Sequence, residues 1–393
     1  SSDAAVEALG PPGPGMCNPD DIEGNDDGRE YISQPALKPG TLCPLRPIGV
    51  ASGPSGEGRL IVERFPLLYE GYTYKYGHIA YVEGRPPAPV IIVHHNYAGL
   101  KQFDIDQACF LAKCGYVGLA IDTYKESSLV GVPDQTLTYA FEDRDPKWDL
   151  DSYGKAVKEG RSPEAQKARI TRHRKGSNAA MMGLLRTPVF WRALMAAWLD
   201  HARTHPAVHP KHAGAIGYCL GGQALLEQVR GGHDIQAMCS FHGLLHSRPE
   251  MPGREEDPRG SFFRRMTAAE FEADETIIKA PNTYTTSCKV LIENGDLDDH
   301  APAESIEEWK KEMDAAGIDW RLNNHSRTPH GFALAPGVAG TAYDENADRR
   351  STLSMLQLFA ETWPEFPQYP VATNACGTVL GQHIVPMATM AKL

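Results

Sequence analysis

The sequence predicts an α/β fold in which helices cover both faces of a mostly parallel sheet. Short runs rich in β-branched residues, such as PVIIVHH (89–95) and YVGLAID (116–122), are typical of strands that are buried on both faces. These runs alternate along the chain with longer helical patterns that end at glycine or proline. Because strand and helix alternate throughout, neighbouring strands are expected to run parallel and to be joined by helical crossovers.

The expected strands are short, apolar and bounded by turn residues. In chain order they span residues 59–65, 77–84, 89–95, 116–122, 213–218, 235–243, 288–295 and 318–325. The expected helices span residues 102–115, 190–205, 222–232, 302–317 and 344–363. In the last of these helices, apolar residues recur at helical spacing and predict its buried face, namely Leu353, Leu356, Ala360 and Trp363.

Composition divides the chain into three parts. Residues 1–58 are rich in proline and glycine, which disfavour long helices and central strands, so we expect an extended or disordered N-terminal arm. Residues 59–365 carry the alternating pattern and are expected to form one α/β domain. Residues 366–393 show no periodicity and are expected to form a C-terminal tail.

Bulk properties exclude several classes of protein. The net charge of −11 argues against a general binder of nucleic acid or anionic membranes, because such proteins carry basic surfaces. No apolar run approaches the roughly 18 residues needed to span a bilayer, so we expect a soluble protein with no membrane insertion.

The cysteines predict a reducing compartment. They are sparse for a chain of 393 residues and form neither a CxxC pair nor a zinc-like quartet, which favours an intracellular protein, cytoplasmic or organellar. The final residues Ala391, Lys392 and Leu393 are close to the Ser-Lys-Leu peroxisomal signal, so a peroxisomal location stays open.

Reactive side chains follow three of the buried strands. Cys219 follows the strand AGAIGY, Asp298 lies in the acidic run GDLDDH after CKVLIEN, and His330 lies in TPHGFA beyond the last strand. In parallel sheets the carboxyl ends of the strands meet at one edge, where ligands bind. Nucleophile, acid and histidine in this chain order are typical of the α/β-hydrolase fold.

The residue types fit nucleophilic catalysis. Glycines on both sides of Cys219 allow a strained turn from strand to helix, and the start of that helix favours a thiolate. His330 is the expected base and Asp298 the residue that orients it; Asp296 and Asp299 are its less favoured neighbours. The backbone N–H groups of Leu220 and Tyr97 are the expected oxyanion hole. The non-catalytic alternatives are that Cys219 is a buried structural thiol and that His330 is an ordinary loop histidine.

These motifs resemble the dienelactone hydrolase (carboxymethylenebutenolidase) family of the α/β-hydrolase superfamily. The resemblance rests on GYCLGG around Cys219, ENGDLDDHAP around Asp298, HGFA from His330 and PVIIVHHNYAG. It covers roughly residues 60–363, with insertions near 125–185 and 245–283. It implies a hydrolase that needs no cofactor and acts on a small-molecule ester or lactone through an acyl-cysteine intermediate.

Two departures from the family concern the substrate. Asn96 stands where members often carry a glutamate, and Leu334 stands where the bacterial enzymes hold the substrate carboxylate with an arginine. We therefore expect His95, Asn96 and Leu334 to line a pocket without a fixed cation. Arg186 and Arg192 are the alternatives that could replace the missing arginine.

A metal site is not expected. His94 and His95 end a buried strand and point to opposite faces, so they are interpreted as core and pocket residues. The function predicted from the sequence is cysteine-dependent hydrolysis. The alternative is a catalytically silent hydrolase fold that serves as a binding or scaffold subunit, which Asn96 and Leu334 mildly favour.

Overall fold

The computed structural model describes the chain between residues 60 and 367, with gaps, together with one short N-terminal strand. The described residues are 31–32, 60–70, 72–74, 77–97, 99–100, 102–124, 180–246, 250–252, 263–334 and 343–367. The expected N-terminal arm and C-terminal tail therefore lie almost wholly outside the described residues. The same is true of most of the expected insertion near 125–185, of part of the one near 245–283, and of the last three residues.

A nine-stranded sheet runs through the described part of the molecule, in the order β1-β2-β5-β7-β6-β8-β9-β12-β13. Its strands are β1 (Tyr31–Ile32), β2 (Leu60–Arg64), β5 (His78–Val82), β7 (Val117–Ile121), β6 (Ala88–His94), β8 (Val208–Tyr218), β9 (Ala237–Phe241), β12 (Lys289–Gly295) and β13 (Asp319–His325). The pairs from β1 to β7 are antiparallel, and every pair from β7 to β13 is parallel. The predicted mostly parallel sheet is confirmed.

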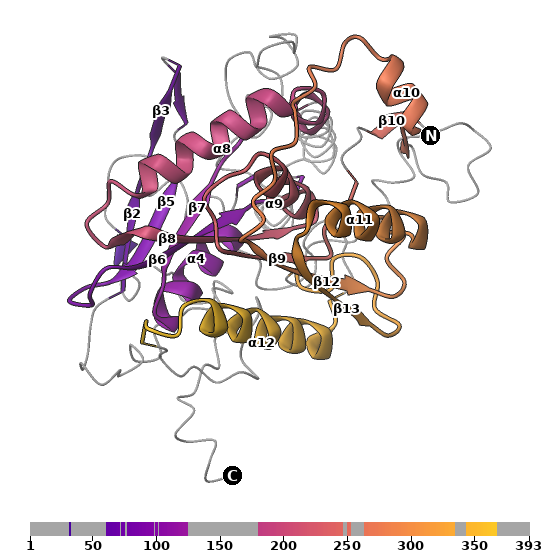
Figure 1. The fold of residues 1–393 in the computed structure, drawn as a ribbon. Helices are drawn as coiled ribbons and strands as arrows, with labels where there is room; N and C mark the ends of the chain where they lie inside the picture. The colour runs from indigo at the N-terminus through magenta and orange to yellow at the C-terminus, as the bar shows by residue number, and fades with distance from the viewer. Residues whose placement is uncertain are drawn as a thin grey trace, which may run out of the picture.

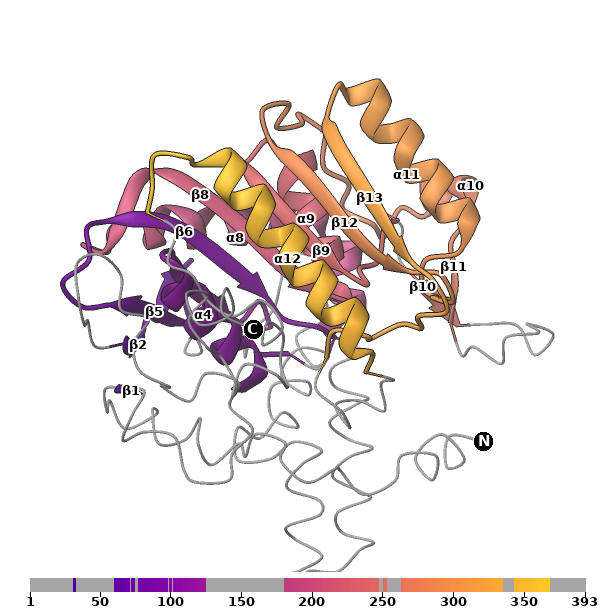
Figure 2. The ribbon, with the colours of Figure 1, turned by 90° about the horizontal axis from the view of Figure 1, so that it is seen from below.

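Helices cover both faces of this sheet (Figures 1 and 2). On one face lie α4 (Gln102–Cys114) and α12 (Glu345–Thr362). On the other face lie α8 (Pro188–Ala202), α9 (Leu220–Arg230) and α11 (Ala303–Ala316). The seven residues of β6 are all buried, because alternate side chains enter the two cores: Val90 and Ile92 pack with α8 and α9, while Ile91 and Val93 pack with α4 and α12.

The ends of α11 follow from local sequence. Pro302 is the residue that precedes its first turn, where a missing backbone N–H costs nothing. Gly317 ends the helix in the left-handed conformation, with φ of 70°, which glycine adopts without steric cost. Trp309 and Met313 are buried one turn apart and anchor α11 on the sheet.

The predicted buried face of α12 is corrected by the structure. Leu353, Leu356 and Ala360 are only partly buried, whereas Trp363 is buried as expected. The buried stripe lies on a different face of the helix and contains Ser351, Met355, Leu358 and Phe359. A serine can face the core because its hydroxyl donates to the backbone oxygen of Asp348 at 2.9 Å, so its polarity does not mark the solvent side.

Several short elements were not predicted. They are the hairpin of β3 (Leu67–Tyr69) and β4 (Tyr72–Tyr74), the hairpin of β10 (Glu250–Pro252) and β11 (Phe263–Arg265), and α10 (Ala268–Ala273). Strands of three residues are too short to show a period. Helix α10 begins with a capping box between Thr267 and Glu270, and this pair of residues in the sequence could have predicted the start of the helix. Strand β8 also begins earlier than predicted, at Val208. Among the described helices, none has the length and apolar character required to cross a membrane.

Candidate active site

Cys219 lies at a sharp turn between β8 and α9. Its backbone has φ of 55° and ψ of −113°, a conformation that residues with a side chain rarely adopt. The turn is held by hydrogen bonds to the end of β9: the Cys219 N–H donates to Phe241 O at 3.2 Å, and Leu244 N–H donates to Cys219 O at 3.1 Å. The structure therefore holds a strained, half-buried cysteine at the carboxyl edge of the sheet.

The two glycines beside Cys219 allow close approach of backbones. A Cβ atom on Gly217 would lie 2.4 Å from the carbonyl carbon of Gly221. A Cβ atom on Gly221 would lie 2.4 Å from the carbonyl oxygen of His94. Both distances are shorter than real Cβ contacts, so only glycine lets α9 begin this close to β8 and β6.

Leu220 is the first residue of α9. Backbone N–H groups in the first turn of a helix have no intrahelical acceptor, and the helix dipole places partial positive charge there. The Leu220 side chain is buried in the core, which fixes the position of this helix end beside Cys219. The arrangement can stabilise negative charge next to the cysteine.

Asp298 and His330 are hydrogen-bonded to each other. The Nδ1 atom of His330 lies 2.9 Å from Oδ2 and 3.0 Å from Oδ1 of Asp298. The carboxylate is fully buried and also accepts the backbone N–H of His300 at 2.8 Å. These bonds fix the carboxylate, and a proton on Nδ1 leaves the other ring nitrogen of His330 free to act as a base.

His330 interacts with both Asp298 and Cys219. Burial by itself lowers the pKa of His330, but the electrostatic interaction with Cys219, the hydrogen bonds that join His330 to the side chains of Asp298 and Cys219, and the charge of Asp298 together raise that pKa to about 10. The ring is only 17% exposed, so these charges act on it with little screening by water. The three side chains, which follow β8, β12 and β13, therefore form one electrostatic unit.

The neighbouring aspartates are placed differently. Asp296 accepts a hydrogen bond from the side chain of Asn324 at 3.1 Å. Asp299 is exposed, and its carboxylate lies 3.9 Å from the ring of His300. Of the three aspartates in GDLDDH, Asp298 is the one whose carboxylate lies within hydrogen-bonding distance of His330.

The two histidines at the end of β6 point in two directions. His94 lies on the side of α9, where its Nε2 atom is 2.9 Å from Gln228 Oε1, and burial lowers its pKa to about 3. His95 lies on the other side, with Nδ1 2.6 Å from Asn96 O and Nε2 3.0 Å from Thr123 Oγ1. Both rings are thus engaged with protein groups. Within the described residues, His, Cys, Asp and Glu form no group that could hold a metal ion.

Asn96 and Tyr97 form the loop that follows β6. Asn96 is buried, and its carbonyl oxygen accepts the N–H of Gly99 at 3.0 Å. Tyr97 is half-buried, and its carbonyl oxygen accepts the hydroxyl of Tyr124 at 2.9 Å. These bonds fix the backbone that carries the expected second oxyanion donor.

Leu334 and the two candidate arginines bear on the charge of a substrate. Leu334 is buried among apolar residues next to Phe332. Arg186 is paired with Asp274 at 3.0 Å. Arg192 donates to Glu227 at 2.7 Å and also to Pro281 O and Asn282 Oδ1. Both arginines are therefore paired with carboxylates in the structure.

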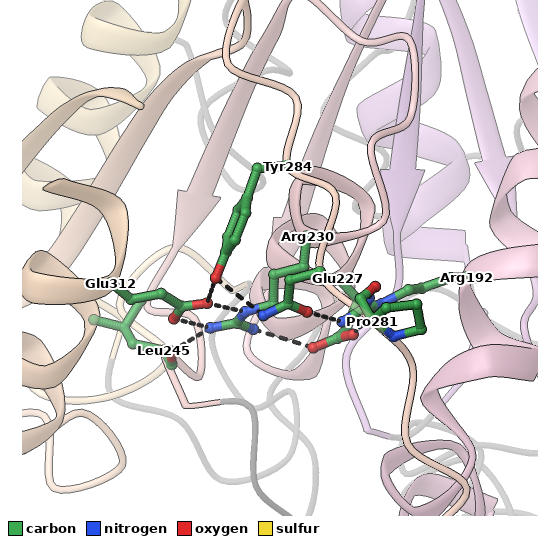
Figure 3. Close-up of polar contacts among 8 residues, drawn as sticks. Arg192, Glu227, Arg230, Leu245, Pro281, Tyr284 and Glu312 are labelled. Atoms are coloured by element: carbon green, nitrogen blue, oxygen red, sulfur yellow. Dashed lines mark hydrogen bonds and ion pairs between the residues drawn. The ribbon is translucent and has the colours of Figure 1, made fainter. Parts of the chain in front are cut away.

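The ion pair of Arg192 belongs to a larger buried cluster of charges. Figure 3 shows Arg230 between Glu312 and Glu227, with Arg192 on the far side of Glu227. Arg230 makes two hydrogen bonds of 2.7 Å to Glu312 and one of 3.1 Å to Glu227. The cluster joins α8, α9 and α11 on the face of the sheet that carries the start of α9.

Two histidines beside His330 were not singled out in the sequence. The ring of His242, after β9, lies 5.0 Å from that of His330, and the ring of His300 lies 4.3 Å away. The signal for His242 was available, because the strand IQAMCSFHG ends at the same edge of the parallel sheet as the strand before Cys219.

Comparisons with known proteins agree with this fold. The model of the dienelactone hydrolase family matches residues 77–363. The solved structure named m3DLH is 23% identical, with a TM-score of 0.50, over 78% of this chain and 99% of the other. A dienelactone hydrolase-like promiscuous phosphotriesterase, P91, from metagenomic libraries is 21% identical, with a TM-score of 0.48, over 77% and 98% of the two chains. The uncharacterized protein K02A2.1 of Caenorhabditis elegans is 26% identical over 43% of this chain and 92% of its own length.

Proposed function

The chain belongs to the dienelactone hydrolase family, and from that premise we propose that Cys219 is its nucleophile, with His330 and Asp298 as partners. Membership in this family supports a hydrolase of carboxylic esters or lactones over the alternative of a silent scaffold. The finer assignment to these three residues rests on one observation in particular. His330 is bonded to Asp298 through Nδ1 and is influenced by the charge of Cys219, so a single imidazole joins the acid and the thiol.

In the first half of the proposed reaction, the Cys219 sulfur attacks the carbonyl carbon of the substrate. The carbonyl π bond opens to an oxyanion, which accepts hydrogen bonds from the backbone N–H groups of Leu220 and Tyr97. As the oxyanion collapses, the C–O bond to the leaving group breaks, and His330 donates its proton to the departing oxygen. The products of this half are an alcohol and an acyl-cysteine; in a lactone both remain on one molecule.

In the second half, His330 is neutral and accepts a proton from water. The resulting hydroxide adds to the thioester carbon, and collapse of this second oxyanion breaks the C–S bond. The acid leaves, and Cys219 and His330 return to their starting charges. Asp298 keeps the Nδ1 proton in place throughout and stabilises the imidazolium each time it forms.

We also propose that the substrate is neutral near the reacting carbonyl, in a pocket lined by His95, Asn96 and Leu334. Burial of Leu334 and the engagement of Arg186 and Arg192 with carboxylates support this proposal within the described part of the chain.

The division of the chain remains part of the proposal. We infer a hydrolase domain over residues 59–365, with residues 1–58 as an arm and 366–393 as a tail. The family match over residues 77–363 supports the extent of the domain.

Trapping of the acyl-enzyme tests the proposed nucleophile. The protein is mixed with p-nitrophenyl acetate, quenched in acid within the first turnovers, digested and mapped by mass spectrometry. The acetyl group is expected on Cys219, because the other described cysteines are buried and burial raises the pKa of Cys109, Cys114 and Cys288. Cys288→Ala is the matched control and should acylate normally. An acetyl group on another residue, coupled to turnover that survives Cys219→Ala, would contradict the proposal.

A further inference from the structure

His242 is a buried histidine in direct ring contact with His330. Its ring centroid lies 5.0 Å from that of His330, with the planes inclined by 74°. On another side, the ring lies 5.3 Å from Phe332 at 77°. His242 is completely buried, so its ring forms an inner wall against which His330 rests.

The turn that carries His242 is tied to the nucleophile. Phe241, the preceding residue, accepts the N–H of Cys219, while Leu244 donates to the Cys219 carbonyl. The N–H of His242 donates to Glu293 O at 2.8 Å. Residues 241–244 therefore hold both the Cys219 backbone and the ring that contacts His330, so the relative positions of Cys219 and His330 depend on this turn.

Two features of His242 are unfavourable for stability. Its φ of 40° lies in the left-handed region, which side chains rarely adopt. Neither ring nitrogen has a hydrogen-bond partner among the described residues, although both are buried. Burial, together with the nearby charges of His330 and His300, holds the pKa of His242 well below its usual value. The ring is therefore uncharged.

The residue type can be explained by the backbone. Asn, Asp and His are the residues other than glycine that most often occupy the left-handed region. Of these three, only histidine has a flat ring. A phenylalanine would provide the ring without unpaired nitrogens, but it tolerates this backbone poorly. Histidine is thus the residue that brings an uncharged ring to His330 at a backbone position with positive φ.

We propose that His242 is a positioning residue, whose ring keeps His330 in the orientation that joins Asp298 to Cys219. The inference rests on the proposed function of these three residues. His330 is held on its inner side by His242 and on its outer side by His300, whose ring lies 4.3 Å away and is half-exposed. Without the inner ring, His330 can rotate away from Cys219 while its neighbours stay folded.

Two substitutions separate the ring from the backbone requirement. His242→Asn removes the ring but suits the left-handed backbone, and His242→Phe keeps a ring and removes the nitrogens. His233→Asn is the matched control. His233 is also a buried histidine with an unpartnered Nδ1, and it follows the end of α9 opposite to Cys219. Each variant is labelled with ¹⁵N-histidine, and the protonation of His330 is followed by NMR alongside kcat and KM.

In wild type, His330 is expected to stay protonated well above the ordinary histidine pKa of about 6.5. His242→Asn should lower the pKa of His330 by about one unit or more. It should also lower kcat by about tenfold or more, with KM changed by less than about threefold. When folded, His242→Phe should keep the pKa of His330 and kcat close to their wild-type values. His233→Asn should match wild type in both. A general loss of packing would lower stability without moving the titration of His330.

The outcomes distinguish this inference from the proposed function. If wild-type His330 titrates as an ordinary histidine, the proposed pair with Cys219 is itself wrong. If wild-type His330 behaves as expected but His242→Asn leaves its titration and kcat unchanged, only the role of His242 is overturned. A fall in kcat of the Asn variant without any change in the pKa of His330 would also overturn it, because His330 would then keep its surroundings when the ring of His242 is removed. The Asn variant decides by itself if the Phe variant does not fold.

Discussion

The carboxylate of Asp298 meets Nδ1 of His330 with both of its oxygens, at 2.9 and 3.0 Å. Asp298→Asn removes the negative charge and presents an amide that can favour the wrong tautomer of the imidazole. We expect kcat to fall by about 10⁴-fold, as it does when the orienting carboxylate of a comparable triad becomes an amide. Steady-state kinetics with an aryl ester measures this loss.

Asp296→Asn and Asp299→Asn are the matched controls, because each changes the same charge within two residues of Asp298. Both should retain kcat within about threefold, since neither carboxylate bonds to His330. A loss at Asp296 or Asp299 as large as that at Asp298 would mean that the net charge of the loop matters, rather than the bond to His330.

Cys219→Ala should abolish ester hydrolysis and leave the fold intact, because the side chain lies at a half-buried turn and not in the core. Cys219→Ser should retain little activity, since the site is arranged for a thiolate and a serine hydroxyl is far less acidic. Hydrolysis rates and circular dichroism of both variants provide the measurements. Wild-type turnover in the alanine variant would remove Cys219 from the mechanism.

The pKa of about 10 for His330 predicts how stability depends on pH. A histidine whose pKa is raised above its unfolded value of about 6.5 stabilises the folded state fully below that pH, and the stabilisation is lost as pH rises through the folded value. The free energy of unfolding should therefore decline between about pH 7 and pH 10. Cys219→Ala removes an interaction that raises the pKa of His330. The free energy of unfolding of this variant should therefore decline less steeply with pH than that of wild type.

The measurement is the difference between wild type and Cys219→Ala in urea unfolding at several pH values. Lysines, tyrosines and the other groups that both proteins share titrate alike and cancel in this difference, which leaves the contribution of His330 together with that of the removed Cys219 thiol. If the free energies of unfolding of the two proteins change in parallel with pH over this range, Cys219 and His330 do not interact electrostatically in the folded state.

Glu227 accepts hydrogen bonds from Arg192 at 2.7 Å and Arg230 at 3.1 Å in the buried cluster of Figure 3. Glu227→Gln leaves Arg192 without a carboxylate partner, and removal of one partner from a buried ion pair costs about 3–5 kcal/mol. We expect about 3 kcal/mol of destabilisation in urea unfolding, near the lower end, because Arg230 keeps Glu312.

Glu307→Gln is the control for Glu227→Gln. Glu307 pairs with Lys310 at 2.7 Å on the exposed side of α11, where an ion pair contributes little to stability. If both variants unfold at nearly the same urea concentration as wild type, the buried cluster does not hold α8 and α9 together.

The charge preference of the substrate can be measured directly. Leu334 is apolar, and Arg186 and Arg192 are paired with carboxylates. A lactone whose carboxylate is masked as a neutral methyl ester should therefore be a better substrate than the same lactone with a free carboxylate. The comparison is kcat/KM for a carboxylated lactone and its neutral methyl ester. A preference of about tenfold for the carboxylate, about 1.4 kcal/mol, would show that a cation does reach the site.

The amino-acid sequence by itself determined the order of strands and helices and the chemistry at the strand ends. Runs such as PVIIVHH and stops such as Gly317 act through neighbours in the chain, so their effect can be read locally. Since parallel strands end at one edge, the positions of Cys219 and His330 after their strands predicted that they would meet, and the structure brings their side chains together.

Other features were decided only by the tertiary structure, because they depend on rotation and packing between distant segments. Asp298 contacts His330, while Asp296 accepts a hydrogen bond from Asn324, because the conformation of the loop directs the two carboxylates to different neighbours. The contact of His242 with His330 is likewise a matter of how the ends of two strands pack. Composition and spacing describe which groups are available at the edge of the sheet. Which pairs of them touch is determined by the three-dimensional arrangement of the strands and loops.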